Sequence, residues 1–215
     1  GYTVENDTAY IKYGDNGIIY VSYEDVNISK NMFGIEKATD TVNYDYIYQY
    51  DEFYPVGGVS SSKSNTVMLC NIFNKKTSGT EYLTQVSLYA PETYTCKVYV
   101  NPNGTSKSKD KLQLVTLKAG ESETFNAGYH TIEFAEPIEI KSASFAVVIE
   151  VQGTNENRVA ISLENKNASN KLWDNVKVEE EKCFLLIGDN LDDSSKWRDL
   201  GKLSETNASL TSGDS

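Results

Sequence analysis

Ser144-Phe145-Ala146-Val147-Val148-Ile149-Glu150-Val151 is the stretch that decides the fold. Its larger apolar side chains recur at every second position, so they share one face of an extended strand. A second stretch alternates in the same way, at Tyr94, Cys96, Val98 and Val100. Two half-buried strands of this kind indicate a β protein with a packed sheet.

Strand patterns recur from residue 66 onward, and short polar breaks with turn residues separate them. The predicted strands are 66–73, 81–90, 94–101, 112–117, 129–134, 144–151, 159–163 and 182–187. No segment shows a sustained helical period with caps. The sequence therefore predicts an all-β fold, an antiparallel β-sandwich of the jelly-roll type found in carbohydrate-binding modules.

The segments that flank these strands have a different composition. Tyrosine occupies alternate positions at Tyr44, Tyr46, Tyr48 and Tyr50. Residues 57–64 are rich in Gly and Ser and are predicted to be a flexible connection. The polar tail from Gly201 onward is expected to be loosely ordered.

The charge balance argues against several classes of partner. The chain has 20 Lys and Arg against 31 Asp and Glu, which gives a net charge of −11. Such a chain repels phosphate backbones and anionic membrane surfaces, so no nucleic-acid partner is expected. No apolar run is long enough to cross a bilayer, so no membrane insertion is expected either. The composition suits a secreted β protein that meets sugars or peptides.

The nucleophilic and metal-binding residue types are sparse. The three cysteines, Cys70, Cys96 and Cys183, are widely spaced, and an odd number gives neither a full disulfide framework nor a zinc signature. We expect three small buried hydrophobic residues, with one disulfide plus a free thiol as the alternative. His130 is the only histidine, and we expect it to satisfy a turn or the core. A hydrolytic triad has no candidate, so the chain is predicted to be non-catalytic.

Sugar recognition requires a flat aromatic face beside planar polar groups. Trp173, followed by Asp174 and Asn175 in a polar loop, is the predicted ligand-binding group. The other tryptophan, Trp197, is a weaker candidate for the same role. Calcium is a possible cofactor, with Asp189, Asp192 and Asp193 as weak candidate ligands. The alternative is that these acidic turns are simply solvated.

Several segments together resemble one family, the lectin-like domain that follows the catalytic domain of bacterial papain-family cysteine peptidases. The segments that carry the resemblance are 48–51, 71–73, 83–89, 94–99, 127–132 with Pro137, 145–149, 184–185 and 197–200. Trp197 stands where this family repeatedly has Trp, so the resemblance implies that it packs. Ahead of them, Tyr13-Gly14-Asp15-Asn16-Gly17-Ile18-Ile19-Tyr20-Val21-Ser22-Tyr23 resembles the closing strand of the peptidase itself. Tyr13 stands where that family has Trp, and Asp7 falls where it has the catalytic Asn, so residues 7–23 resemble a degenerate remnant.

The resemblance implies a domain organisation and a function. Residues 1–57 would hold the remnant and the aromatic connecting segment, 58–200 the lectin-like sandwich, and 201–215 a flexible tail. The four alternate tyrosines would lie at an interface with the peptidase domain, with sugar binding or plain strand packing as alternatives. We expect a non-catalytic accessory domain of a secreted or cell-surface bacterial peptidase, binding cell-wall or host glycans. The alternative is a structural spacer that packs on the cognate peptidase domain without binding sugar.

Overall fold

The chain forms two units in the computed structural model, Gly1–Thr41 and Val42–Ser215. The structure describes residues 2–5, 8–11, 44–50, 57–61, 64–156, 158–163, 179–191 and 196–202. In the first unit, β1 (Tyr2–Glu5) pairs antiparallel with β2 (Thr8–Ile11). The predicted peptidase-strand remnant at Tyr13–Tyr23, and Asp7 before it, lie outside the described residues. The predicted domain boundaries stay predictions.

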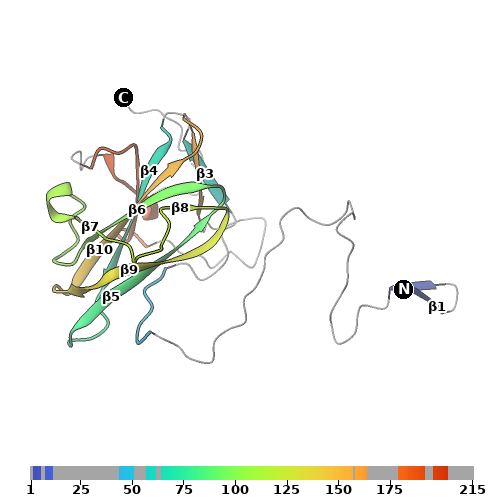
Figure 1. Cartoon of the computed structure of the whole chain (residues 1–215), viewed down its shortest axis with the longest axis horizontal. Coiled ribbons are helices and arrows are strands. Elements are labelled where there is room, and N and C mark those ends of the chain that lie inside the picture. Colours follow the sequence, from blue (N-terminus) through green and yellow to red (C-terminus); the bar gives the residue numbers. More distant parts are fainter. Residues whose placement is uncertain are drawn as a thin grey trace. The chain divides into compact units, whose positions relative to one another are not determined.

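The second unit is built from antiparallel strands (Figure 1). One sheet has seven strands in the order β13-β12-β4-β10-β6-β7, and β8 also pairs with β6. Its members are β4 (Thr66–Asn74), β6 (Tyr94–Asn101), β7 (Gln113–Leu114), β8 (Thr124–Phe125), β10 (Ser144–Gly153), β12 (Cys183–Ile187) and β13 (Arg198–Asp199). Two further pairs are β5 (Glu81–Ala90) with β9 (Gly128–Ile140), and β3 (Gly57–Ser61) with β11 (Val159–Leu163). Short 3-10 turns are η1 (Lys109–Lys111) and η4 (Leu200–Lys202).

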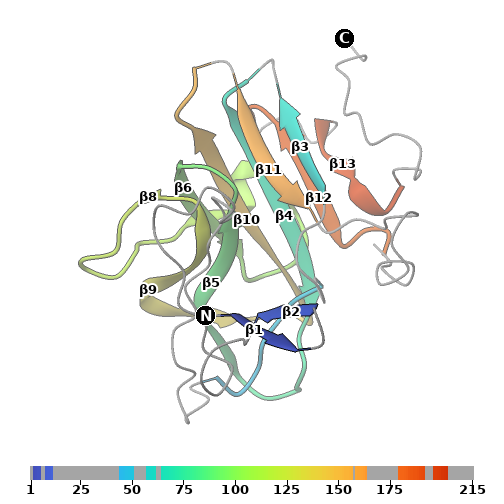
Figure 2. The ribbon, with the colours of Figure 1, turned by 90° about the vertical axis from the view of Figure 1, so that its right-hand side faces the viewer.

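The order of pairing is that of a jelly roll. Strand β4 pairs with β10, and the next strand, β5, pairs with β9, so a ribbon of two consecutive strands folds against another such ribbon. Strand β10 lies between β4 and β6. Figure 2 shows β13 beside β12 at one margin of the large sheet. The predicted all-β antiparallel sandwich is confirmed.

Both faces of the seven-stranded sheet are covered by apolar side chains. Phe145 belongs to the main core, which also contains Ile132 of β9 and Ile161 of β11. Ala146 and Val148, on the same strand, belong to a second cluster on the opposite face of the sheet, hereafter the outer face. A strand buried on both faces requires an almost continuous apolar run, which explains the sequence of β10.

The structure corrects the expectation for residues 57–64. Gly57–Ser61 forms β3 and pairs with β11, although Gly and Ser have low strand propensity. The pairing with β11 holds this segment as a strand in spite of its low strand propensity. Strand β9 also runs further than predicted, past Pro137, where its pairing with β5 is irregular between Leu83 and Gln85. Proline is tolerated in a strand at such an irregularity.

Two of the cysteines and the histidine lie as expected. Cys70 and Cys96 are buried, whereas Cys183 is only half-buried, and none of the three is in a disulfide. The ring Nε2 of His130 is 2.6 Å from the carbonyl oxygen of Asn126, so the side chain satisfies a turn. Within the described ranges, no helix has the length and apolar character needed to span a membrane.

Candidate functional site

A groove of about 780 Å³ opens on the outer face of the seven-stranded sheet. Its floor is apolar and comes from three separate strands or turns: Ile72 of β4, Phe184 of β12, and Trp197 just before β13. Ile72 and Trp197 are buried members of the outer-face cluster, and Phe184 packs against it. The other ten lining residues are polar or charged, so the groove is more polar than a typical small-molecule pocket.

One wall of the groove is the loop after β6, which contributes Thr105 and Lys107. Asn101 shapes this loop from below, because its side chain donates to the carbonyl oxygen of Ser106 at 2.9 Å and accepts from the backbone N–H of Asn103 at 3.1 Å. Asn101 is only 3% exposed. A buried amide with both its donor and its acceptor satisfied holds such a loop in one conformation.

The opposite wall joins the turn before β12 to the segment after β13. The Asp199 carboxylate accepts from the backbone N–H of Glu181 at 2.8 Å and of Gly201 at 2.9 Å. A Cβ at Gly201 would lie 2.5 Å from the carbonyl oxygen of Glu179, so only glycine allows this close approach. The wall is also tied to the floor, since the Ile72 N–H donates to the Lys182 carbonyl oxygen at 2.8 Å.

Trp197 carries an unsatisfied donor at the groove. Its side chain is 9% exposed, and its Nε1–H has no hydrogen-bond partner among the residues the structure describes. The expectation that Trp197 packs is confirmed. A buried donor without a partner has a free-energy cost of about 1–3 kcal/mol, which opposes the gain from packing the indole in the outer-face cluster.

The floor of the groove also positions a cation. The Lys107 ammonium lies 3.7 Å from the centroid of the Phe184 ring, within the range of a cation–π interaction. At the mouth, the Ser144 hydroxyl donates to Asn74 Oδ1 at 2.9 Å. The groove therefore combines an aromatic floor with a fixed ammonium.

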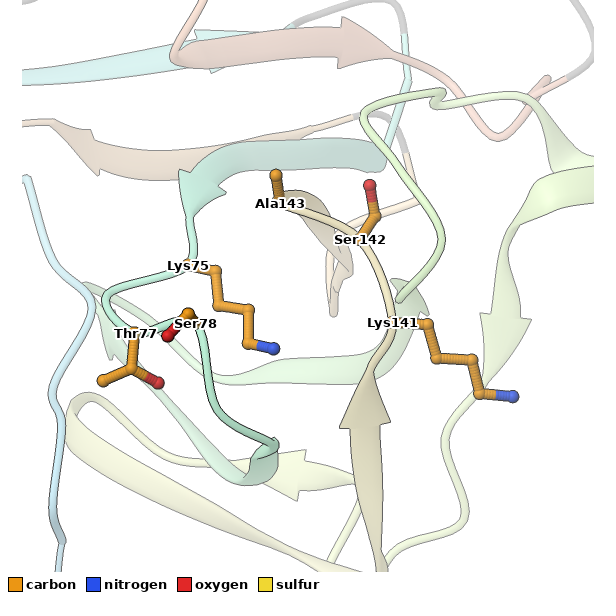
Figure 3. Close-up of a pocket in the computed structure, with 6 residues that line it drawn as sticks. All are labelled: Lys75, Thr77, Ser78, Lys141, Ser142 and Ala143. Atoms are coloured by element: carbon orange, nitrogen blue, oxygen red, sulfur yellow. The ribbon is translucent and has the colours of Figure 1, made fainter.

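A second, smaller pocket of about 270 Å³ lies where the loops after β4 and β9 meet. It is lined by Lys75, Thr77, Ser78, Lys141, Ser142 and Ala143. Figure 3 shows that the amine of Lys141 points away from that of Lys75. The Thr77 hydroxyl donates to Glu81 at 2.8 Å and is already used. These polar groups do not converge on one point, so this pocket is a weaker candidate than the groove.

The predicted aromatic segment, residues 44–50, lies against the sandwich, and we call it the strap. The Tyr48 hydroxyl donates to the buried carboxylate of Glu81, which also accepts from the Thr77 N–H at 2.6 Å. Lys76 binds the strap as well, through a 2.6 Å hydrogen bond from Nζ to the Ile47 carbonyl oxygen. Burial opposes ionisation of Glu81, but the hydrogen bonds from Tyr48 and Thr77 outweigh it and lower the pKa of this carboxyl.

Two of the four strap tyrosines enter the core. The Tyr48 ring meets Phe145 edge-on at 5.1 Å, and the Tyr50 ring stacks on Phe73 at 5.0 Å with an interplanar angle of 11°. Burial raises the pKa of both tyrosines to about 12. Tyr44 and Tyr46 remain exposed, and Tyr44 donates to the side chain of Gln85. The role of these tyrosines at a peptidase interface stays a prediction.

Most of the predicted ligand and calcium residues fall outside the described part of the chain. These are Trp173, Asp174, Asn175, Asp192 and Asp193. Asp189 is described and exposed. Within the described ranges, no group of three His, Cys, Asp or Glu side chains is placed to hold a metal ion. The groove residues were not singled out from the sequence, although the motif Trp197-Arg198-Asp199-Leu200 contains three of them.

Comparison with known families decides the assignment of the chain. Residues 47–211 match the model of the lectin-like domain, which is most of the chain. The chain belongs to the lectin-like domain family. The matched range includes the sandwich, most of the strap and every residue that lines the groove. The predicted resemblance is thus confirmed.

Two solved structures of a larger protein are similar to part of this chain. The clostridial cysteine protease Cwp84 after propeptide cleavage has a TM-score of 0.54 and 16% identity, over 74% of this chain and 36% of that one. The cysteine protease and lectin-like domains of Cwp84, a surface-layer-associated protein of Clostridium difficile, have a TM-score of 0.47 and 14% identity, over 66% and 29%. This chain thus spans about a third of the first protein's length, and the likeness establishes the fold. No curated protein matches.

Proposed function

We propose that this lectin-like domain is a non-catalytic, saccharide-binding accessory domain of a larger peptidase-related protein, and that the groove is its binding site. The observation that carries the proposal is the Lys107 ammonium, held 3.7 Å from the centroid of the Phe184 ring on the floor of the groove. Sugars offer hydroxyl oxygens as acceptors and an apolar ring face, and both match these features. Cell-wall and host glycans are the saccharides that a secreted or surface protein would meet.

The chemistry of the thiols supports a non-catalytic role. Burial raises the pKa of Cys70 and of Cys96 to about 12. A nucleophilic thiol needs a lowered pKa and partial exposure, which these two cysteines do not have. His130, the only imidazole in the chain, lies tilted by 55° against the Phe125 ring and contacts a turn carbonyl rather than a thiol.

A glycan array followed by isothermal titration calorimetry of the full chain tests the proposal. Lys107→Gln removes the ammonium at the floor of the groove, and we expect it to weaken the binding of any glycan hit by about tenfold. Lys141→Gln is the matched control, because Lys141 is an exposed lysine that lines only the smaller pocket. Equal affinity of the Lys107→Gln variant and the wild type would exclude the groove as the binding site.

A spacer that packs on a peptidase domain is the second candidate. The strap favours it, because the hydrogen bonds of Tyr48 and the ring stack of Tyr50 fix where the chain enters the sandwich. A rigid entry point sets the position of a preceding domain. Tight association with an isolated papain-type peptidase domain, together with no glycan binding on the array, would support the spacer and reject the saccharide-binding proposal.

A further inference from the structure

One end of the sandwich gathers lysines on a strongly acidic protein. Three loops lie at this end, and we call them the basic end: residues 75–80 after β4, 102–111 after β6, and 141–143 between β9 and β10. Together they contain one carboxylate, Asp110, and six lysines, namely Lys75, Lys76, Lys107, Lys109, Lys111 and Lys141. The whole chain, in contrast, has a net charge of −11.

The three loops form one continuous surface because their strands are neighbours. Strand β10 lies between β4 and β6, and adjacent strands are only about 4.8 Å apart. Backbone hydrogen bonds also join the loops to one another. The Lys75 N–H donates to the Ala143 carbonyl oxygen at 2.8 Å, and the Lys141 N–H donates to the Pro102 carbonyl oxygen at 3.0 Å. The lysines of the basic end therefore share one surface.

Several of these charges are not neutralised. Asp110, the one carboxylate of the loops, pairs with Lys111 at 3.0 Å. Within the described ranges, no ion pair joins Lys75 or Lys141 to a carboxylate. Lys76 donates at 2.6 Å to a backbone carbonyl oxygen, which satisfies the ammonium without cancelling its charge.

The surroundings of the basic end reduce its charge without reversing it. Two carboxylates stand beside it at the strand ends, Glu81 on β5 and Glu139 on β9, which leaves an excess of three positive charges. The neighbouring groove is balanced, since three cations and three carboxylates line it apart from Lys107. The Debye length is about 8 Å at physiological salt, so an anion at this end responds to the loops rather than to distant acidic residues.

The composition of the loops narrows the class of partner. They contain no Trp, Tyr, Phe, Met or Arg, the residues enriched at protein–protein interfaces, and they are rich in Lys and Ser, which are depleted there. Proteins that bind single-stranded nucleic acid stack its bases on aromatic side chains. A sugar ring likewise requires a flat aromatic face. Lysine and hydroxyl side chains instead suit a flexible anionic chain that has no ring face.

The smaller pocket at the centre of the basic end does not suit a compact ion. Lys75 and Lys141 line it together with the hydroxyl-bearing Thr77, Ser78 and Ser142. Figure 3 shows the amine of Lys141 pointing away from that of Lys75, so the two do not converge on one ion. An extended chain with charges at intervals can bridge them.

We propose that the basic end docks a polyol-phosphate polymer, a flexible chain of phosphodiesters joined by short polyol units. Successive phosphates lie at Lys75 and Lys141, and the polyol hydroxyls meet the serine and threonine side chains of the loops. Lysine binds phosphate as a point charge, without the planar fork by which arginine matches a carboxylate. This docking surface is distinct from the groove, so the inference goes beyond saccharide binding and does not rest on it.

Isothermal titration calorimetry of the full chain with a synthetic poly(glycerol phosphate) and a neutral polyglycerol of the same length tests the proposal. We expect only the phosphate polymer to bind, with an affinity that falls as salt is raised. Exposed ionic contacts are individually weak, so Lys75→Gln and Lys141→Gln should each lower the affinity by about two- to fivefold, and the double variant by about tenfold.

Lys118→Gln is the matched control, because it removes the same charge from an exposed lysine outside the three loops, where Lys118 pairs with Glu133. It should leave the affinity unchanged, and thermal melts verify that every variant is folded. Equal weakening by Lys118→Gln and Lys141→Gln, or equal binding of the neutral polymer, overturns the proposal. Tighter binding of an oligoglutamate of equal charge rejects the phosphate, and tighter binding of single-stranded DNA rejects the polyol.

The same variants separate this docking surface from the groove. Lys141→Gln should weaken the phosphate polymer and leave the binding of a groove-bound glycan intact. Polymer binding together with an empty glycan array supports the basic end and rejects only the groove. Glycan binding without polymer binding rejects only the basic end.

Discussion

Replacing Glu81 by Gln should release the strap from the sandwich. Glu81 is 7% exposed and accepts hydrogen bonds from the Tyr48 hydroxyl, from the Thr77 N–H at 2.6 Å and from the Thr77 hydroxyl at 2.8 Å. Gln keeps one carbonyl oxygen, which can serve Thr77. Its amide group is a donor, so the Tyr48 hydroxyl loses its charged acceptor.

The expected loss follows from these bonds. A hydrogen bond to a charged group contributes about 1.5–3 kcal/mol, and a neutral one about 0.5–1.5 kcal/mol. Losing the Tyr48 bond and weakening the two from Thr77 should lower the free energy of unfolding by about 2–3 kcal/mol. For a domain of this size that corresponds to a fall in Tm of about 5–10 °C. Urea and thermal melts measure it, and chymotrypsin cleavage after the strap tyrosines should become faster.

Two controls separate the strap from a general charge effect. Glu139→Gln removes an exposed carboxylate on β9 and should change the free energy of unfolding by less than about 0.5 kcal/mol. Tyr48→Phe removes the same bond from the other side, so the double variant should be destabilised by less than the sum of the two single ones. Equal stability of the Glu81→Gln and Glu139→Gln variants, or strict additivity of the Tyr48→Phe and Glu81→Gln effects, would refute the claim that the Tyr48–Glu81 hydrogen bond holds the strap.

The lowered pKa of Glu81 makes the same contact sensitive to acid. An ordinary Glu has a pKa of about 4.3, and the folded-state pKa of Glu81 lies below its usual range. The unfolded chain therefore binds the proton first as the pH falls, and the stabilisation present above about pH 4.3 is lost as the pH approaches the folded-state pKa. The stability difference between the wild type and the Glu81→Gln variant should shrink over this interval.

Two further predictions concern the groove wall and the thiols. Gly201→Ala should displace the groove wall, because its Cβ would lie 2.5 Å from the Glu179 carbonyl oxygen. We expect the free energy of unfolding to fall by about 1–3 kcal/mol and glycan binding to weaken in calorimetry. Unchanged stability and affinity would contradict the wall geometry. An aromatic disulfide reagent at pH 8 should label Cys183 in the folded protein and leave Cys70 and Cys96 unlabelled until denaturant is added. Three reactive thiols without denaturant would contradict the burial of Cys70 and Cys96.

The strands were predictable where each one buries a face against the rest of the protein. Strand β5 has the predicted bounds, and so does β6, because their ends coincide with turn residues and their apolar positions alternate. Strand β3 was not predictable from its own sequence. Its Gly57-Gly58 start disfavours a strand, and only the partner β11, which lies far along the chain, makes it one.

The alternate tyrosines of the strap indicated aromatic packing but not the backbone conformation of the strap. Tyrosine at every second position predicts one shared face of a strand. Residues 44–50 are instead irregular, with bends at Asp45 and Tyr50, so the four rings reach different neighbours. Tyr46 is 47% exposed, whereas Tyr48 enters the core. A periodicity argument requires regular backbone, and the strap has none.

The groove was hidden from the sequence because its parts come from distant segments. Lys107 follows β6, Phe184 lies in β12 and Arg198 in β13, and each is an ordinary polar or apolar residue in its own segment. Only the pairing of β12 with β4 and β13 brings these segments together. The local search for an aromatic residue in a polar loop led to Trp173, which lies outside the described residues and stays a prediction.

The strap and the groove meet at one residue, so the two proposed functions are physically connected. The Tyr50 hydroxyl donates to the carbonyl oxygen of Ile72, and the N–H of Ile72 donates to the Lys182 carbonyl oxygen at 2.8 Å. Ile72 and Lys182 both line the groove. A ligand that orders this wall would therefore also stabilise the end of the strap, since binding that orders one side of a shared contact lowers the entropy cost on the other. Saccharide binding and a fixed entry of the chain into the sandwich can then reinforce each other.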